Sequence, residues 1–121
     1  PAALYENHAT FAAEREKILR LIEQEQLKNV IFLSGDRHKT ELTKWEGENG
    51  IKIYDFTSSP LSSTSYNSVN EGNYLRVEGT HYGKQNFGML KFEGSLEERK
   101  LILQTYDQAG KLVWSHEIEA E

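Results

Sequence analysis

The first third of the chain alternates apolar and charged residues with the period of an amphipathic helix. We expect this helix to run from Thr10 to about Gln26, with these residues on its apolar side: Phe11, Ile18, Leu21 and Ile22. Thr10 is a suitable N-cap, because its hydroxyl can accept a hydrogen bond from the first turn. Lys28-Asn29 is expected to end the helical segment, since Asn tolerates the left-handed backbone conformation that closes helices.

An unbroken apolar run, Val30-Ile31-Phe32-Leu33, follows the helix. Strands without polar alternation are typical of parallel sheets that are covered on both faces, so the run predicts a buried strand. Helix, short turn and apolar strand are the second half of a βαβ-like unit, and no matching strand precedes the helix in this sequence. We therefore expect the chain, which begins at Pro1, to be a piece of a longer protein.

Beyond residue 38 the pattern predicts antiparallel strands over residues 40–45, 51–57, 74–78, 87–93, 99–106 and 111–119. Asn49-Gly50 and the segment 107–110 are hairpin turn signals. The side chains expected to point inward in the last hairpin are Leu101, Leu103, Leu112, Trp114 and Ile118. Together these elements predict an α+β fold over residues 1–121: one N-terminal amphipathic helix followed by a mostly antiparallel β-sheet or sandwich.

The segment 58–73 is rich in Ser and Asn and is expected to be a long loop, a length that in compact domains usually accompanies function or disorder.

The amino-acid composition argues against several classes of protein. The 121 residues carry a net charge of −5 without a basic stripe, so a nucleic-acid-binding surface is not expected. Without Cys there is no disulfide framework and no thiolate metal site, and the longest apolar run is far too short to cross a membrane.

Two potential metal ligands, Asp36 and His38, come directly after the apolar strand in Ser34-Gly35-Asp36-Arg37-His38. A carboxylate and an imidazole suit a divalent cation such as Zn, Mn, Fe or Ca, acting as a Lewis acid and water activator. An Asp-x-His pair also arises by chance, as an Asp that caps a turn beside a His that bonds locally. The end of a buried strand favours the metal interpretation, because ligands of open α/β sheets gather at carboxyl ends of strands.

Other polar residues near this motif have two interpretations each. Arg37 can bind a phosphate oxygen or pair with a surface acid, and Glu41 can orient the His38 imidazole or face solvent on an edge strand. His8 is expected to cap or to be solvated, His81 could line a pocket, and His116 is expected at the surface or half-buried in the last strand. The serines of residues 58–63 lack a Gly-x-Ser-x-Gly elbow, so serine hydrolase chemistry has no support.

Four motifs in order resemble the C-terminal part of PhoD-like phosphatases, the alkaline phosphatase D branch of the metallophosphoesterases. They are the segment 30–38, Glu41-Leu42, Thr57-Ser58-Ser59-Pro60-Leu61 and Asn86-Phe87-Gly88. The resemblance implies an α/β/β/α core with a dinuclear metal site that hydrolyses phosphomonoesters or phosphodiesters. Gly35-Asp36-Arg37-His38 stands in place of the superfamily's Gly-His-x-His, which implies that Asp36 binds one metal and His38 the other.

The family's earlier ligand motifs are missing from this sequence, so it resembles the C-terminal portion of such an enzyme and is expected to be inactive alone. The resemblance implies these partners: a phosphate ester substrate, the N-terminal part of the same enzyme, and a second copy of the chain at a truncated sheet edge. It also implies an exported, periplasmic or extracellular, location. The alternative is a non-catalytic helix-plus-β-sandwich module that binds another protein through its acidic surface and the loop 58–73.

Overall fold

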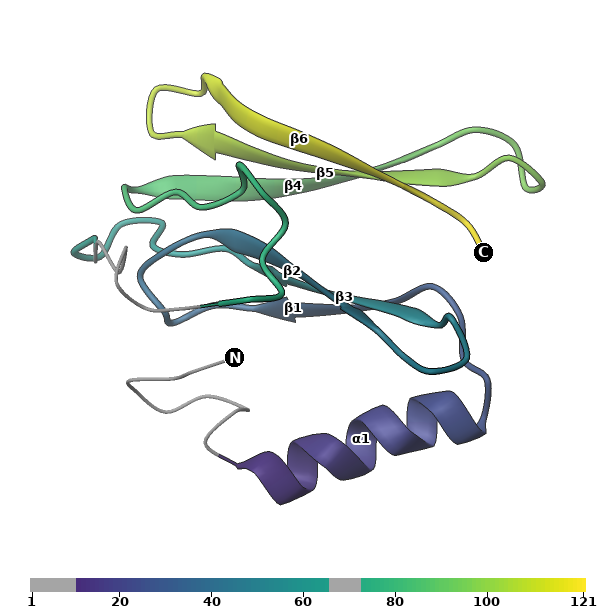
Figure 1. Cartoon of the computed structure of the whole chain (residues 1–121). Coiled ribbons are helices and arrows are strands. Elements are labelled where there is room, and N and C mark those ends of the chain that lie inside the picture. The colour runs from purple at the N-terminus through teal and green to yellow at the C-terminus, as the bar shows by residue number, and fades with distance from the viewer. Residues whose placement is uncertain (1–10, 66–72) are drawn as a thin grey trace.

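The computed structural model describes residues 11–65 and 73–121, which form one helix and six strands. Their bounds are α1 Ala12–Gln24, β1 Val30–Ser34, β2 Glu41–Glu46, β3 Lys52–Thr57, β4 Asn86–Glu93, β5 Lys100–Asp107 and β6 Leu112–Glu119. Figure 1 shows three layers, with α1 against one three-stranded sheet and the second sheet stacked on that sheet's other face. The α+β prediction is confirmed. Within the described ranges, no helix has the length and hydrophobicity needed to cross a bilayer.

The first sheet has the strand order β1-β3-β2, and the second has the order β4-β5-β6. In the first sheet, β1 runs parallel to β3, with Val30 opposite Ile53 and Ser34 opposite Thr57. All other neighbouring strands are antiparallel. Because β1 and β3 are parallel, their carboxyl ends lie at the same edge of the sheet, and the segments that follow both strands begin there.

The expectation that β1 is buried on both faces is wrong for its second half. Val30, Ile31 and Phe32 are half-buried, whereas Leu33 is 63% exposed. The reason is that β1 is an edge strand of its sheet and pairs only with β3 among the described strands. Its apolar sequence is that of an interior strand, but its position is not.

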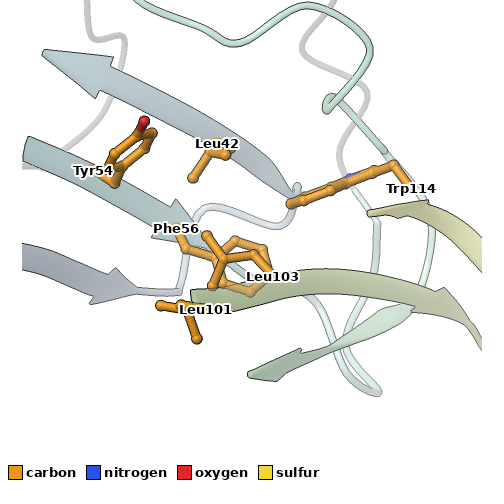
Figure 2. Packing of buried hydrophobic residues seen from close by; sticks show 6 residues of the cluster. All are labelled: Leu42, Tyr54, Phe56, Leu101, Leu103 and Trp114. Atoms are coloured by element: carbon orange, nitrogen blue, oxygen red, sulfur yellow. The ribbon is translucent and has the colours of Figure 1, made fainter. Parts of the chain in front are cut away.

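Two groups of buried apolar side chains hold the three layers together. Between the sheets lie Leu42, Tyr54, Phe56, Leu101, Leu103 and Trp114 (Figure 2). The rings of Phe56 and Trp114 meet edge to face with centroids 5.4 Å apart, a favourable geometry for an aromatic pair. The second group, Ile22, Ile51 and Ile53, packs α1 onto the first sheet.

The helix differs from its prediction at both ends and on one side. Phe11 is the N-cap and forms no side-chain capping bond, while Thr10 lies outside the described residues. The helix ends at Gln24 and Gln26 adopts the left-handed conformation, with a φ of 51°, so Asn29 (φ 59°) leads into β1 instead. Phe11 and Leu21 are each 55% exposed, because Phe11 precedes the helix and Leu21 lies about 100° around it from Ile22.

Both predicted hairpins form, between β2 and β3 and between β5 and β6. Leu112, however, is 45% exposed instead of buried. A bulge places Trp114 opposite Thr105 but Leu112 opposite Tyr106, so the extra residue moves Leu112 to the outer face of the sheet.

The strand expected over residues 74–78 is also wrong. Turns closed by Arg76 N–H to Asn73 O and by Thr80 N–H to Val77 O interrupt the segment. Its strand pairing with β2 is limited to one isolated β-bridge, between Arg76 and Thr43. The predicted loop 58–73 is described for residues 58–65 and for Asn73, and residues 66–72 lie outside the described part.

Candidate metal centre

The carboxyl ends of β1 and β3 bring two loop segments of the sequence together. Ser58, the residue after β3, donates its N–H to the carbonyl of Ser34 at 2.9 Å. Further along, the backbone N–H of His38 donates to Ser59 Oγ at 3.1 Å, and His38 Nε2 lies 3.5 Å from Ser63 Oγ. The Asp36-to-His38 turn and the serine segment therefore form one corner of the molecule.

Both predicted ligands adopt left-handed backbone conformations. The φ angle is 62° at Asp36 and 53° at His38. Asp and His are among the few side chains enriched in this region, but the conformation is still uncommon for residues other than glycine. Such outliers cluster at functional sites, so the backbone geometry independently draws attention to the residues that the motif singled out.

The corner is open to ligands. Asp36 is exposed, and Arg37 and His38 are half-buried. A carboxylate and an imidazole form a donor pair that fits a divalent cation. Within residues 11–65 and 73–121, no group of three or more His, Cys, Asp or Glu side chains lies close enough together to hold a metal ion. The pair thus fits part of a donor set, because stable protein sites for zinc-type cations use three or four protein ligands.

A polar cluster borders this corner on the face of the sheet that α1 covers. Ser34 Oγ donates to Asp55 Oδ1 at 2.8 Å and lies 2.9 Å from Thr57 Oγ1. Asp55 and Thr57 continue the face on which Ile51 and Ile53 pack against the helix. The sequence carries the signal, since that face of β3 changes from apolar to polar at Asp55, but no motif marks these residues as part of a site.

Glu41 has neither of its two expected roles. It is buried, 6% exposed, and accepts hydrogen bonds from Lys39 Nζ at 3.1 Å and Arg76 Nε at 2.5 Å. Asn73 Nδ2 donates to the same carboxylate at 3.2 Å. Burial by itself raises the pKa of Glu41, but Lys39 and Arg76 together outweigh burial and lower the pKa below its ordinary value. Glu41 thus anchors a buried ion-pair cluster and does not face solvent.

Of the histidines that the structure describes, neither His81 nor His116 joins Asp36 and His38 in a cluster that could hold a metal. His81 is half-buried, and its pKa is lowered by burial and by the neighbouring Arg76 cation. Its Nε2 atom is buried and finds no hydrogen-bond partner in the described part of the chain. His116 is half-buried as expected, with its ring 6.1 Å from that of Tyr54, while His8 lies outside the described residues.

Comparisons with known proteins give one finding. The model of one protein family, described as PhoD-like phosphatase, matches residues 2–110 of the chain. No curated protein and no solved structure matches the sequence.

Proposed function

Because the chain belongs to the PhoD-like phosphatase family, we propose that it supplies Asp36 and His38 to a two-metal site of a phosphoric ester hydrolase. PhoD-like phosphatases are metal-dependent in general. The observation that carries the proposal is the turn at residues 36–38. It presents a carboxylate and an imidazole, both on left-handed backbone, at the edge where the parallel strands β1 and β3 end.

Each residue of the turn has a proposed role. Asp36 and a ring nitrogen of His38 would hold cations, which when bound supply Lewis acid polarisation of the ester and activation of water. Arg37, which lies between them and is half-buried, would bind an oxygen of the phosphate group. Its planar guanidinium matches the geometry of phosphate and stabilises charge that develops there.

The donor pair is too small for tight binding on its own. We propose that the remaining ligands come from the N-terminal part of the same enzyme, and that the chain alone binds Zn²⁺, Mn²⁺, Fe²⁺ or Ca²⁺ weakly and has no phosphatase activity. Export from the cytoplasm is part of the proposal and is tested by fractionating cells that express the whole gene. Stoichiometric, metal-dependent hydrolysis of p-nitrophenyl phosphate or bis-p-nitrophenyl phosphate by residues 1–121 would contradict the idea of an incomplete site.

Metal binding is tested on the ¹⁵N-labelled chain with Mn²⁺, which broadens the NMR signals of nearby nuclei. We expect selective broadening at residues 35–38 and at the neighbouring segment 58–63. Asp36→Ala and His38→Ala should each reduce it strongly. Glu48→Gln, which removes an exposed carboxylate in the β2–β3 turn, is the matched control and should leave it unchanged. Broadening spread evenly over acidic surface residues would refute the site.

We also propose that a second copy of the chain is a partner of this one. A groove of about 650 Å³ runs beside the β1 edge, and its walls include the exposed apolar side chains Leu33, Leu90, Phe92 and Leu96. Unpaired strand edges beside exposed apolar surface favour self-association. We expect concentration-dependent dimers in sedimentation analysis, weakened by Leu33→Lys. The control is Leu61→Lys, at a residue that is 74% exposed and outside the groove.

The rival to the enzyme is a module that only binds a partner protein. Asp36→Ala and His38→Ala in the full-length gene product separate the two functions. Loss of hydrolysis with an intact fold supports the enzyme, whereas unchanged hydrolysis supports the module.

A further inference from the structure

Three buried polar residues from distant parts of the chain meet directly behind His38. Thr40, Ser59 and Asn86 are 0%, 8% and 3% exposed. Thr40 Oγ1 donates to Asn86 Oδ1 at 2.6 Å and accepts the Ser59 N–H at 3.1 Å. Asn86 Nδ2 donates to the carbonyl of Ser59 at 2.9 Å and to that of Lys84 at 2.8 Å. Nearly all the hydrogen-bonding groups of this network are therefore satisfied within the protein.

The network fixes the segment 59–60 from several sides. Besides its side-chain bonds, Asn86 donates its backbone N–H to Pro60 O at 2.9 Å. Asn86 is the first residue of β4, so the second sheet holds the serine segment against the first sheet. Thr40 is in turn fixed by a pair of backbone bonds with Tyr82, each 2.8 Å long. A buried polar network of this kind holds one arrangement, because any departure leaves desolvated groups without partners.

The network contacts the candidate metal centre through one hydrogen bond. Ser59 Oγ accepts the backbone N–H of His38, the residue whose φ of 53° turns the chain at the corner. Thr40 lies two residues after His38, and both residues form hydrogen bonds with Ser59, in opposite directions. His38 N–H donates to Ser59, and Ser59 N–H donates to Thr40.

We infer that Thr40, Ser59 and Asn86 are positioning residues, which hold His38 in the conformation in which it binds metal. The inference rests on the proposed role of His38. It also explains why polar side chains occupy interior positions beside a corner that is itself exposed, where apolar residues would cost less to bury. Residues that orient a metal ligand change metal affinity by about 10- to 100-fold when they are altered.

The test compares Thr40→Val, which has the same shape without the hydroxyl, with Thr40→Ser, which keeps the hydroxyl. In Thr40→Val the His38 amide should exchange its hydrogen about fivefold faster, and the midpoint of Mn²⁺ broadening at residues 35–38 should rise about tenfold. Thr40→Ser should restore both values. Gln85→Ala is the control, since Gln85 bonds the carbonyls of Ser62 and Ser63 at the exposed side of the same loop.

Ser59→Ala keeps the test decisive if Thr40→Val does not fold, because it removes only the acceptor of the His38 N–H. It should reproduce faster exchange and weaker Mn²⁺ binding. Unchanged His38 exchange in both variants, or a change that Thr40→Ser does not restore, overturns the inference. If the wild-type chain shows no selective Mn²⁺ effect, the proposed function fails, and the exchange of the His38 amide still decides whether the network positions this residue.

Discussion

Replacing Glu41 by Gln should destabilise the protein strongly, although the two side chains have almost the same shape. The carboxylate is buried and is the acceptor for Lys39 Nζ and Arg76 Nε. The Lys39 side chain is 3% exposed and that of Arg76 is 22% exposed. With Glu41 the three side chains carry a net charge of +1, from two cations and one anion, and with Gln they carry +2.

The magnitude follows from the burial of the partners. Removing one member of a buried ion pair costs about 3–5 kcal/mol, because the remaining charge stays desolvated. Arg76 is partly solvated, which screens its share, so we expect the lower end, about 3 kcal/mol. Adding Lys39→Met to Glu41→Gln should recover part of this loss, since replacing both members of a buried pair by uncharged groups is often neutral.

The assay is urea unfolding followed by the fluorescence of Trp45 and Trp114, with helix and strand content checked by circular dichroism. The pH dependence gives a second readout. The pKa of Glu41 is lowered in the folded state, so its contribution is present above the unfolded value of 4.5 and is lost as the pH falls through the folded pKa. The difference between wild type and Glu41→Gln should therefore shrink at acid pH. A cost below about 1 kcal/mol at pH 7, or a further loss on adding Lys39→Met, would refute the reasoning.

Four further substitutions test the packing and the titration. Gly88→Ala should lower the unfolding free energy by about 1–3 kcal/mol, because the added Cβ would lie 2.9 Å from Phe56 ring atoms and from Ser58 Oγ. Gly35→Ala is the control in the same urea experiment. It should cost much less, because its added Cβ would have its nearest contact at 3.6 Å. Thr105→Val should raise the unfolding free energy by about 1 kcal/mol, because the Thr105 hydroxyl is buried without a partner in the described part of the chain; a loss of stability would show that the hydroxyl is bonded. The pKa of His81 is lowered in the folded state, so the contribution of His81 to stability is complete above the ordinary pKa of 6.5 and is lost below pH 6.5, by at most about 1.4 kcal/mol per pH unit. His81→Gln should therefore flatten the loss of stability between neutral pH and pH 5. An unchanged slope in this variant would contradict the role of His81.

The helix and strands with a clear pattern of apolar and polar residues could be predicted from the sequence. The burial of individual side chains, which depends on neighbouring strands, could not. The helix, β1 and both hairpins follow from local patterns, and the hairpin after Asp107 has its expected turn with Gly110 at a φ of 79°. Leu112 and Leu33 were misassigned for reasons that no local pattern reveals. One depends on a bulge that shifts the register of β6, and the other on how many strands flank β1.

Of the candidate site, only the two proposed metal ligands could be predicted from the sequence. Asp36 and His38 are predicted as ligands because they follow an apolar strand, a signal contained in nine consecutive residues. The network behind them joins Thr40 to Asn86 across 46 positions, and the ion-pair cluster joins Glu41 to Arg76 across 35. Polar side chains at these positions are unremarkable in the sequence, and only the fold shows that they are buried and paired with one another.

The face of β3 that meets α1 has an apolar half, which packs on the helix, and a polar half, which lies beside the candidate metal centre. Ile51 and Ile53 are buried under the helix, and the same face continues with Asp55 and Thr57, which join Ser34 in a hydrogen-bonded cluster. The apolar half anchors the sheet, while the polar half ends at the corner with Asp36 and His38. Polar substitutions at Ile53 should therefore act on folding, whereas isosteric changes at Thr57 should act mainly on the corner. This division follows from the carboxyl ends of two parallel strands meeting at one edge, which is where open α/β sheets bind their ligands.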